Sequence, residues 1–323
     1  MLIHDRPSSR QRPHPAIVSL VASRVLVTGA TGFVGAQICR VLVREGHSII
    51  GTYHRREPSS SQPSMEWVRA DLRTPTLPVA LPADITAVVH FAAALPIDIP
   101  STEASSANFA IDRNVFEFAN RSRIPVIYAS GTAVYGRVAQ QSTALTQESS
   151  PVDPLSPYTA EKVWAERYGM ELAATTGAGF TALRICAPYG PKQERPTVIA
   201  TFVKRAIHGE RLLYHGSGTR EQMFTHVDDV AEAVAACIHR PTTGVFNIAG
   251  KETITMRDLA LMIAELAGRT TTEAVAASGA PDPEEGCRAR FDVRAAATRL
   301  DWTPRVSLWV GLQGCIAEAR SGD

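Results

Sequence analysis

The sequence lacks the features that mark several large classes of protein. Its 33 basic and 32 acidic residues leave a formal net charge of +1, which gives no electrostatic basis for binding nucleic acid or an anionic membrane surface. No stretch approaches the roughly 20 apolar residues that a membrane-spanning helix needs. We therefore expect neither nucleic acid nor a membrane among the partners of this chain.

Cysteines are few, odd in number and far apart, at positions 39, 186, 237, 287 and 315. None of them forms a C-x-x-C pair or the Cys/His spacing of a zinc site. This usage is typical of reduced thiols in a cytoplasmic protein, and we expect no bound metal.

The first 23 residues contain several arginines and prolines before a short apolar run, AIVSLVA. This is the outline of a signal peptide. However, the run leads directly into a predicted core strand, so that cleavage would leave the fold barely intact. We interpret residues 1–23 as a flexible N-terminal extension.

Short apolar segments rich in β-branched residues then alternate with segments of helical period. The predicted strands are 24–29, 47–53, 66–70, 85–93, 124–130 and 180–185, and the predicted helices are 36–46, 101–121 and 158–177. Continuous apolar strands that alternate with helices are typical of a parallel sheet covered on both faces. The sequence therefore predicts an α/β fold with a doubly wound parallel sheet.

The segment VLVTGATGFVG places three glycines between a predicted strand and a predicted helix. Gly29 permits a tight turn, Gly32 lets the backbone approach a pyrophosphate, and Gly35 allows close helix–strand packing. The N-terminus of the helix adds partial positive charge. In this context the segment predicts a dinucleotide-binding site, although the spacing is G-x-x-G-x-x-G rather than G-x-G-x-x-G.

The end of the second predicted strand, GTYHRRE, bears on the choice of dinucleotide. A carboxylate there binds the ribose 2′-hydroxyl of NAD, whereas a basic side chain accepts the 2′-phosphate of NADP. Tyr53 ends the strand, and Arg55 and Arg56 follow it without an intervening carboxylate. The sequence thus favours NADP, with NAD as the alternative. Asp71 and Leu72 end the third strand, where we expect contacts to adenine.

After residue 187 the alternation loosens, and polar, Pro-rich linkers such as SGAPDPEEG separate the predicted helices. We expect a smaller second domain, partly interleaved with the first. The predicted NAD(P)-binding domain comprises residues 24–187 plus about 224–250, and the predicted substrate-binding domain comprises residues 188–223 plus 251–323.

The segments TGATGFVG, VVHFAA, SANFAIDRNVFEFA, IYASGTAVYG, PYTAEK, FTHVDDVAEAV and GVFNIAG follow one another along the chain. Together they resemble the extended short-chain dehydrogenase/reductase family, of the NAD-dependent epimerase/dehydratase type, over about residues 24–320. The resemblance implies a Rossmann domain with a small C-terminal mixed α/β substrate domain, and a homodimer formed through the helices 101–121 and 158–177. It also implies cofactor contacts from Thr31, Phe33, Val34, Phe91, Ala92, Ala93, Asn108 and Pro188.

Tyr158 and Lys162 in PYTAEK match the catalytic pair of that family. They lie four residues apart on a predicted helix and therefore on the same face. Hydride transfer to a ketone generates an alkoxide, which must be protonated. A lysine ammonium favours the phenolate of a tyrosine, whose unperturbed pKa is about 10, and so we expect Lys162 to lower the pKa of Tyr158. The resemblance also implies that Lys162 bonds the nicotinamide ribose.

A third group should hold the substrate oxygen, and the segment IYASGTAVYG leaves its identity open. The family most often has serine or threonine where this chain has Gly131. Ser130 and Thr132 flank that glycine, and the resemblance slightly favours Ser130. The Thr-Asp-Glu of the family's dehydratases is missing here, so we do not expect 4,6-dehydration.

Two further departures from the family concern the substrate. Ala187 stands where its nucleotide-sugar enzymes usually have asparagine, and Gln222 stands where they have an arginine that pairs with the diphosphate. Arg220, two positions earlier, either reaches the same phosphate or is a surface charge.

The first hypothesis is therefore an NADP-dependent oxidoreductase that reduces a keto group of a sugar, expected to be nucleotide-activated. An NAD-dependent nucleotide-sugar epimerase is the second hypothesis, and the missing acidic residue after the second strand argues against it. A reductase of a non-nucleotide ketone or aldehyde is a further alternative. The intact Tyr158 and Lys162 argue against a catalytically silent dinucleotide sensor.

Overall fold

A computed structural model describes residues 23–55, 58, 64–75, 77, 81–142 and 144–322. Seven parallel strands form one sheet in the order β11-β6-β5-β4-β1-β2-β3. Their bounds are β1 Arg24–Thr28, β2 Ser48–Tyr53, β3 Met65–Arg69, β4 Ala87–His90, β5 Val126–Gly131, β6 Phe180–Ile185 and β11 Gly244–Ile248. The strand order reverses at β1, between β2 and β4, which is the doubly wound Rossmann arrangement. The predicted fold class is confirmed.

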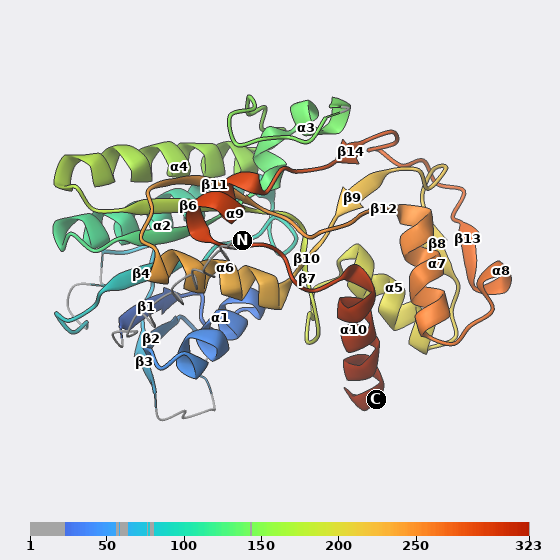
Figure 1. Cartoon of the computed structure of the whole chain (residues 1–323), viewed down its shortest axis with the longest axis horizontal. Helices are drawn as coiled ribbons and strands as arrows, with labels where there is room; N and C mark the ends of the chain where they lie inside the picture. Colours follow the sequence, from blue (N-terminus) through green and yellow to red (C-terminus); the bar gives the residue numbers. More distant parts are fainter. Residues whose placement is uncertain are drawn as a thin grey trace, which may run out of the picture.

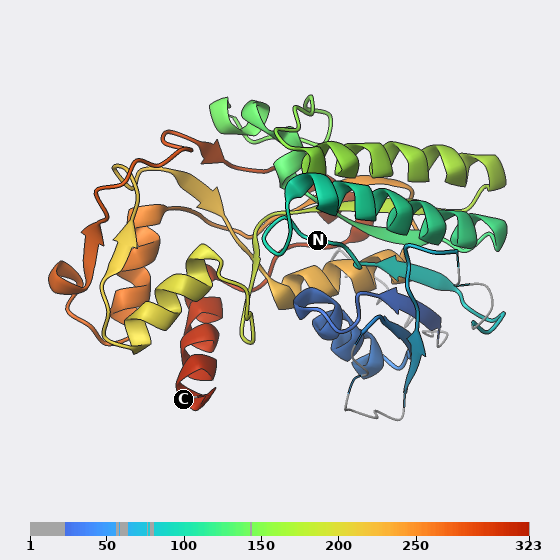
Figure 2. The same cartoon turned by 180° about the vertical axis from the view of Figure 1, so that it is seen from behind.

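Helices cover both faces of this sheet (Figure 1). On one face lie α1 Phe33–Arg44, α6 Val227–His239 and α9 Arg294–Leu300. On the other lie α2 Ser101–Arg121 and α4 Pro157–Thr176, which run side by side (Figure 2). All six residues of β6 are buried, as expected for a strand covered from both sides.

A second group of elements stands beyond the carboxyl ends of these strands (Figure 1). Its helices α5 Val198–Ile207, α7 Met256–Leu266 and α10 Leu308–Gly322 share one apolar cluster. Short strands accompany them: β7 Pro188–Tyr189, β8 Leu212–Tyr214, β9 Glu221–Met223, β10 Thr225–His226, β12 Thr253–Thr255, β13 Val275–Ala277 and β14 Arg288–Ala289. The remaining short helices are η2 Thr132–Tyr135, α3 Arg137–Gln141 and α8 Thr271–Ala274.

The two groups are interleaved along the chain. Ala296, Leu300 and Trp302 pack on the face of the large sheet with α1 and α6, although they lie within the predicted substrate-binding domain. The domain boundaries stay a prediction, and residues 1–22 of the predicted extension lie outside the described part of the chain. None of the helices that the structure describes is long and apolar enough to cross a bilayer.

Candidate active site

The predicted site residues gather beyond the carboxyl ends of the parallel strands. β1 and β4 are neighbours in the sheet, with Thr28 opposite His90 at their ends. Parallel α/β sheets bind ligands at this edge, where the strand order reverses. The glycine-rich turn follows β1 and leads into α1, while the segment 91–94 follows β4.

Two close backbone approaches explain the glycines of this turn. Gly29 has a φ of 70°, and a Cβ there would lie 2.6 Å from the carbonyl carbon of Phe91. A Cβ on Gly35 would lie 2.1 Å from the carbonyl oxygen of Gly29. The Gly32 N–H donates to that same oxygen at 2.9 Å and closes the turn. The backbone therefore forms a cradle that fits a pyrophosphate at the N-terminus of α1.

The remaining predicted cofactor residues differ in exposure. Thr31 is exposed, and Phe33 and Val34 are half-buried in the first turn of α1. Phe91, Ala92 and Ala93 follow β4 and are half-buried, and Pro188 at the start of β7 is half-buried too. Their contacts to a cofactor stay a prediction.

Asn108 has a supporting role in this geometry. Its side chain is fully buried, and its amide accepts from the Ala94 N–H at 2.8 Å and donates to the Ala94 carbonyl at 3.0 Å. Both ends of the amide are thus used to hold the segment that follows β4. Asn108 positions the backbone beside the turn, where Phe91 and Ala92 meet Gly29.

The ends of β2 and β3 carry a mixture of charges. Tyr53 is half-buried, Arg55 is exposed, and Arg56 lies outside the described residues. Asp71 accepts hydrogen bonds from Arg73 at 2.7 and 2.9 Å, which lower the pKa of Asp71 to about 2. The carboxylate at this edge is therefore ionised and already bound by an arginine.

Leu72 follows as a buried residue, and its carbonyl accepts from Asn114 Nδ2 at 3.0 Å. This bond ties the end of β3 to α2. Leu72 is thereby fixed beside the predicted adenine site.

Helix α4 begins with local contacts that fix the position of Tyr158. The Ser156 hydroxyl accepts from the Thr159 N–H at 3.2 Å, the Thr159 hydroxyl accepts from the Ser156 N–H at 3.1 Å, and Pro157 takes the first helical position. Such a reciprocal cap satisfies two backbone donors at once. Tyr158 consequently lies in a well-defined first turn, one turn before Lys162.

Tyr158 and Lys162 come together, as predicted. Lys162 Nζ lies 5.7 Å from the centre of the Tyr158 ring and donates to the Tyr128 hydroxyl at 2.7 Å. Burial raises the pKa of Tyr158 above 10.0, while Lys162 lowers it. The lysine acts in the expected direction, but burial outweighs it, so that the net shift is opposite to our expectation. A raised pKa keeps the phenol protonated at neutral pH.

The structure separates the two candidates for the third catalytic group. The Ser130 hydroxyl donates to Glu166 Oε1 at 2.6 Å, and the same carboxylate binds Arg184 Nε and Nη2 at 2.9 and 2.6 Å. Ser130 is thereby part of a buried ion pair. Thr132 begins η2, is 8% exposed, and lies beside the Cys186 thiol.

Arg220, the predicted phosphate ligand, already has two carboxylate partners. Its Nε lies 3.1 Å from Asp282 Oδ2, and Nη1 bonds Glu284. Ala187 has a φ of 34°, a left-handed conformation in which asparagine is enriched and other side chains are uncommon. The backbone therefore keeps the shape suited to the family's asparagine, although the polar group is missing.

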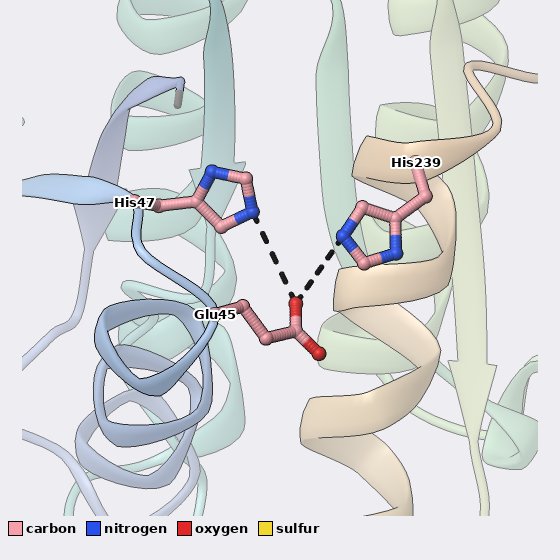
Figure 3. A group of neighbouring side chains, drawn as sticks. All are labelled: Glu45, His47 and His239. Atoms are coloured by element: carbon pink, nitrogen blue, oxygen red, sulfur yellow. Dashed lines mark ion pairs between the residues drawn. The ribbon is translucent and has the colours of Figure 1, made fainter. Parts of the chain in front are cut away.

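A polar cluster that the sequence did not reveal joins Glu45, His47 and His239 (Figure 3). Glu45 Oε2 lies 3.9 Å from His47 Nε2 and 3.3 Å from His239 Nε2. The Ser23 N–H donates to His47 Nδ1, and burial lowers the pKa of His47, so the neutral ring carries its proton on Nε2. A metal ligand atom must be unprotonated, and the cluster therefore does not fit a metal centre.

Comparisons with known proteins agree with this geometry. The model of the NAD dependent epimerase/dehydratase family matches residues 25–249. The chain is 25% identical to UDP-glucuronic acid decarboxylase 1 of Arabidopsis thaliana, over 92% of this chain and 70% of that protein.

Solved structures show the same fold. The UDP-glucose 4-epimerase of Thermotoga maritima, crystallised with UDP-glucose, has a TM-score of 0.83 at 23% identity, over 93% of this chain and 99% of that chain. MoeE5, in complex with UDP-glucuronic acid and NAD, has a TM-score of 0.77 at 28% identity, over 93% and 100%. The chain therefore belongs to the NAD-dependent epimerase/dehydratase family and is an enzyme of the extended short-chain dehydrogenase/reductase kind.

Proposed function

We propose that this chain is an NADP-dependent oxidoreductase that reduces a keto group of a nucleotide-activated sugar, with Tyr158 as the proton donor. The observation that carries the proposal is the half-buried phenol of Tyr158 at the start of α4, one turn before the ammonium of Lys162. Burial raises the pKa of Tyr158, so the phenol holds its proton until the substrate oxygen becomes basic. Lys162 then stabilises the phenolate that remains.

The bound nicotinamide supplies the hydride, and the chain's residues bind and orient it. Gly29 and Gly35 let the turn close, because a Cβ at either position would strike backbone, and the N-terminus of α1 behind the turn is the proposed site of the pyrophosphate. Arg55, exposed after β2, and its neighbour Arg56 are the proposed partners of the 2′-phosphate. Each charge-assisted contact of this kind contributes about 1.5–3 kcal/mol, enough for tenfold or more in affinity.

The preference for NADPH has a direct test. Calorimetric titration should give tighter binding of NADPH than of NADH. Replacing Arg55 and Arg56 by alanine together should weaken NADPH and leave NADH nearly unchanged. Arg40, exposed on α1, provides a control for the loss of a surface arginine. Equal affinities in the unmodified chain would remove the argument for NADP.

Support for a nucleotide handle on the substrate comes from the ligands named for similar structures, UDP-glucose and UDP-glucuronic acid. The chain's own residues make the point testable, because Asp282 and Glu284 already pair with Arg220 and would compete with a diphosphate for it. If Arg220 makes that exchange, Arg220→Ala should reduce kcat/KM strongly for a nucleotide-bound keto-sugar and little for a simple ketone. Equal small losses would favour a non-nucleotide carbonyl substrate.

An NAD-dependent nucleotide-sugar epimerase is the second candidate. The similarity to MoeE5, crystallised with NAD, favours it at the level of the cofactor. Such an enzyme oxidises and re-reduces one carbon and consumes no cofactor. Incubating the purified chain with UDP- and dTDP-linked sugars and keto-sugars separates the two functions: net oxidation of NADPH supports the reductase, and isomerisation without added cofactor supports the epimerase.

Tyr158→Phe tests the role of the phenol in either reaction. Only the transferable proton is lost, so turnover should fall by about 10²–10⁴-fold while cofactor binding stays close to normal. Tyr168→Phe is the matched control, because Tyr168 lies on the same helix and its hydroxyl bonds Glu117 at 3.1 Å. If Tyr158→Phe retains more than about a tenth of the rate, another acid performs the step.

We also propose that the chain forms a homodimer through the outer faces of α2 and α4, and that it works in the cytoplasm. Phe109 on α2 is 40% exposed and packs on Trp164 of α4 with ring centres 4.5 Å apart. Trp164 stacks in turn on Tyr168. Aromatic side chains of this kind are enriched in subunit interfaces. Light scattering of the unmodified chain and of Phe109→Asp measures whether this surface joins two copies.

A further inference from the structure

A set of buried hydrogen bonds continues from Lys162 into the core. Tyr128 OH accepts from Lys162 Nζ at 2.7 Å and donates to Asp112 Oδ2 at 2.6 Å. The other oxygen of Asp112 lies 2.9 Å from His90 Nε2, and His90 Nδ1 lies 2.6 Å from the Thr28 hydroxyl. Elements α4, β5, α2, β4 and β1 each contribute one of these side chains. The set links the proposed catalytic lysine to the strand that ends in the glycine-rich turn.

These groups are shielded from water almost completely. Thr28, His90, Asp112 and Tyr128 have no exposed surface, and Lys162 is 4% exposed. A buried ammonium is costly unless a counter-charge lies close to it. Asp112 Oδ2 lies 4.0 Å from Lys162 Nζ and provides one.

A second acid lies beside the same lysine. Glu161 precedes Lys162 on α4 and is 1% exposed, and its carboxyl lies within hydrogen-bonding reach of the Asp112 and Asn108 side chains. Burial raises the pKa of Glu161 to about 9; Lys162 opposes this, and Asp112 adds to it. The Glu161 carboxyl is therefore neutral at pH 7.

Asp112 behaves in the opposite way. Burial opposes its ionisation, but Lys162 and His90 outweigh burial and hold the pKa of Asp112 below its usual range. Of the two acids next to Lys162, one is thus ionised and one keeps its proton. A pair of carboxyl groups at one site commonly divides in this manner, because the charge of one disfavours ionisation of the other.

We propose that Asp112 and Glu161 are positioning residues for Lys162. Asp112 is the counter-charge of the ammonium and also orients it through Tyr128. Glu161 is a reserve acid, which ionises when Asp112 is removed. The inference rests on the proposed function for the catalytic role of Lys162. The residues that position Lys162 come from three elements: Asp112 from α2, Tyr128 from β5 and Glu161 from α4.

The net charge of the groups around Lys162 affects how easily Tyr158 and Lys162 lose a proton. The titratable groups that act on Lys162 are Asp112 from α2, Tyr128 from β5, and Tyr158, Glu161 and Glu166 from α4. Glu166 is already paired with Arg184 of β6. Negative charge at Asp112 or Glu161 favours the state in which Tyr158 and Lys162 both hold their protons. Removing that charge makes the first proton of the pair easier to lose, whichever of the two groups loses it.

The pH dependence of ketone reduction tests this consequence. Reduction needs the fully protonated pair, so the rate falls as pH rises through the apparent pKa of the pair. In the double variant Asp112→Asn/Glu161→Gln, this alkaline limb should move to lower pH by about one to three units. Each single replacement leaves one acid beside Lys162, so the two single shifts should add up to less than the double shift.

Asp258→Asn is the matched control, because Asp258 is exposed in the first turn of α7 and far from Lys162 in the chain. Its pH profile should coincide with that of the unmodified chain. A double variant with an unshifted alkaline limb would overturn the inference. So would single shifts that add up to the shift of the double variant, because Glu161 would then not act as a reserve.

A second measurement is independent of turnover. In the Glu161→Gln background, urea denaturation compares Asp112→Asn, Lys162→Met and the two together. Asp112→Asn should lower the midpoint when Lys162 is present and should not lower it when methionine replaces the lysine, because no buried ammonium is then left unpaired. If Asp112→Asn does not fold while Lys162 is present, folding of the variant that also carries Lys162→Met shows equally that the unpaired ammonium caused the loss.

The two measurements separate the possible failures. If the effects of Asp112→Asn and Lys162→Met on the midpoint are non-additive but the chain turns over no keto-sugar, the charge pairing is supported and the proposed function is refuted. Additive effects on the midpoint together with normal turnover would refute the role of Asp112 and retain the proposed function.

Discussion

Replacing Ser130 by alanine distinguishes the two candidate hydroxyls at the end of β5. The Ser130 hydroxyl donates to Glu166 at 2.6 Å, and Glu166 binds Arg184 through both carboxylate oxygens. This hydroxyl is therefore part of the core, and we expect Ser130→Ala to lower stability more than turnover. We therefore propose Thr132 as the hydroxyl that holds the substrate oxygen.

The size of the effect follows from the contacts that the variant loses. A hydrogen bond to a charged group contributes about 1.5–3 kcal/mol, and Ser130 is only 7% exposed, so water does not replace the lost donor. The ion pair between Glu166 and Arg184 persists in the variant. The loss should therefore stay below the roughly 3–5 kcal/mol expected when one partner of a buried ion pair is removed, as in Glu166→Gln.

Urea denaturation and steady-state turnover on the same preparations provide the assay. Ser156→Ala is the matched control: it removes the cap of α4, at about 1 kcal/mol, without touching Glu166. Thr132→Val should lower kcat by about 10²-fold or more, by analogy with the loss of one preorganised donor to a reacting oxygen. If Ser130→Ala keeps its denaturation midpoint and loses most of its turnover, the reasoning from Glu166 is wrong.

Three further predictions concern the surroundings of the site. Arg73 lowers the pKa of Asp71 to about 2, so the stability contributed by this carboxylate is present above a pH of about 4 and is lost as the pH falls towards 2; Asp71→Asn should flatten acid denaturation in that window. Burial raises the pKa of four cysteines to about 12, whereas Cys287 is partly exposed, so a thiol reagent at pH 8 should label Cys287 first, and mass spectrometry of the labelled peptides checks this. A Cβ at Gly131 would meet nothing nearer than the Ile185 carbonyl at 3.7 Å, so Gly131→Ser should keep its melting temperature, whereas Gly29→Ser, whose Cβ would strike backbone, should not.

The large sheet was predictable from the sequence because most of its strands are short apolar segments rich in β-branched residues. The predicted helix 101–121 coincides with α2, and the predicted strand 180–185 coincides with β6. The strand predicted at 85–93 is shorter, since β4 ends at His90. Residues 91–93 leave the sheet and pass over the turn, where a Cβ on Gly29 would lie 2.7 Å from the Ala92 nitrogen.

The short strands of the second group were not predictable in detail. β9 pairs with β12 and β14, which are 30 or more residues away along the chain, and none of these strands is longer than three residues. A segment of that length is too short to show an alternating pattern. Its pairing depends on contacts with segments far away along the chain, which no local signal encodes.

The set of motifs that carries the family resemblance indicated Tyr158 and Lys162, but not the charged side chains beneath them. Asp112 and Glu161 act on Lys162 from different helices, and only the fold brings α2 and α4 together. One signal was available. Asp112 shares the buried helix face of Asn108 and Val115, and a carboxylate on a core-facing stripe is rarely left without a partner.

Helix α4 is held in place by polar contacts at three successive levels. The reciprocal cap fixes Ser156, the contacts of Lys162 with Tyr128 and Asp112 fix the next turn, and the pair between Glu166 and Arg184 fixes the turn after that. Apolar packing tolerates small displacements, whereas each of these buried groups loses its partner if the helix slides. Because Tyr158 lies between the first two levels, a shift that moves the phenol also breaks buried polar contacts. The same residues that balance charge in the core therefore fix the position of Tyr158, the proposed proton donor.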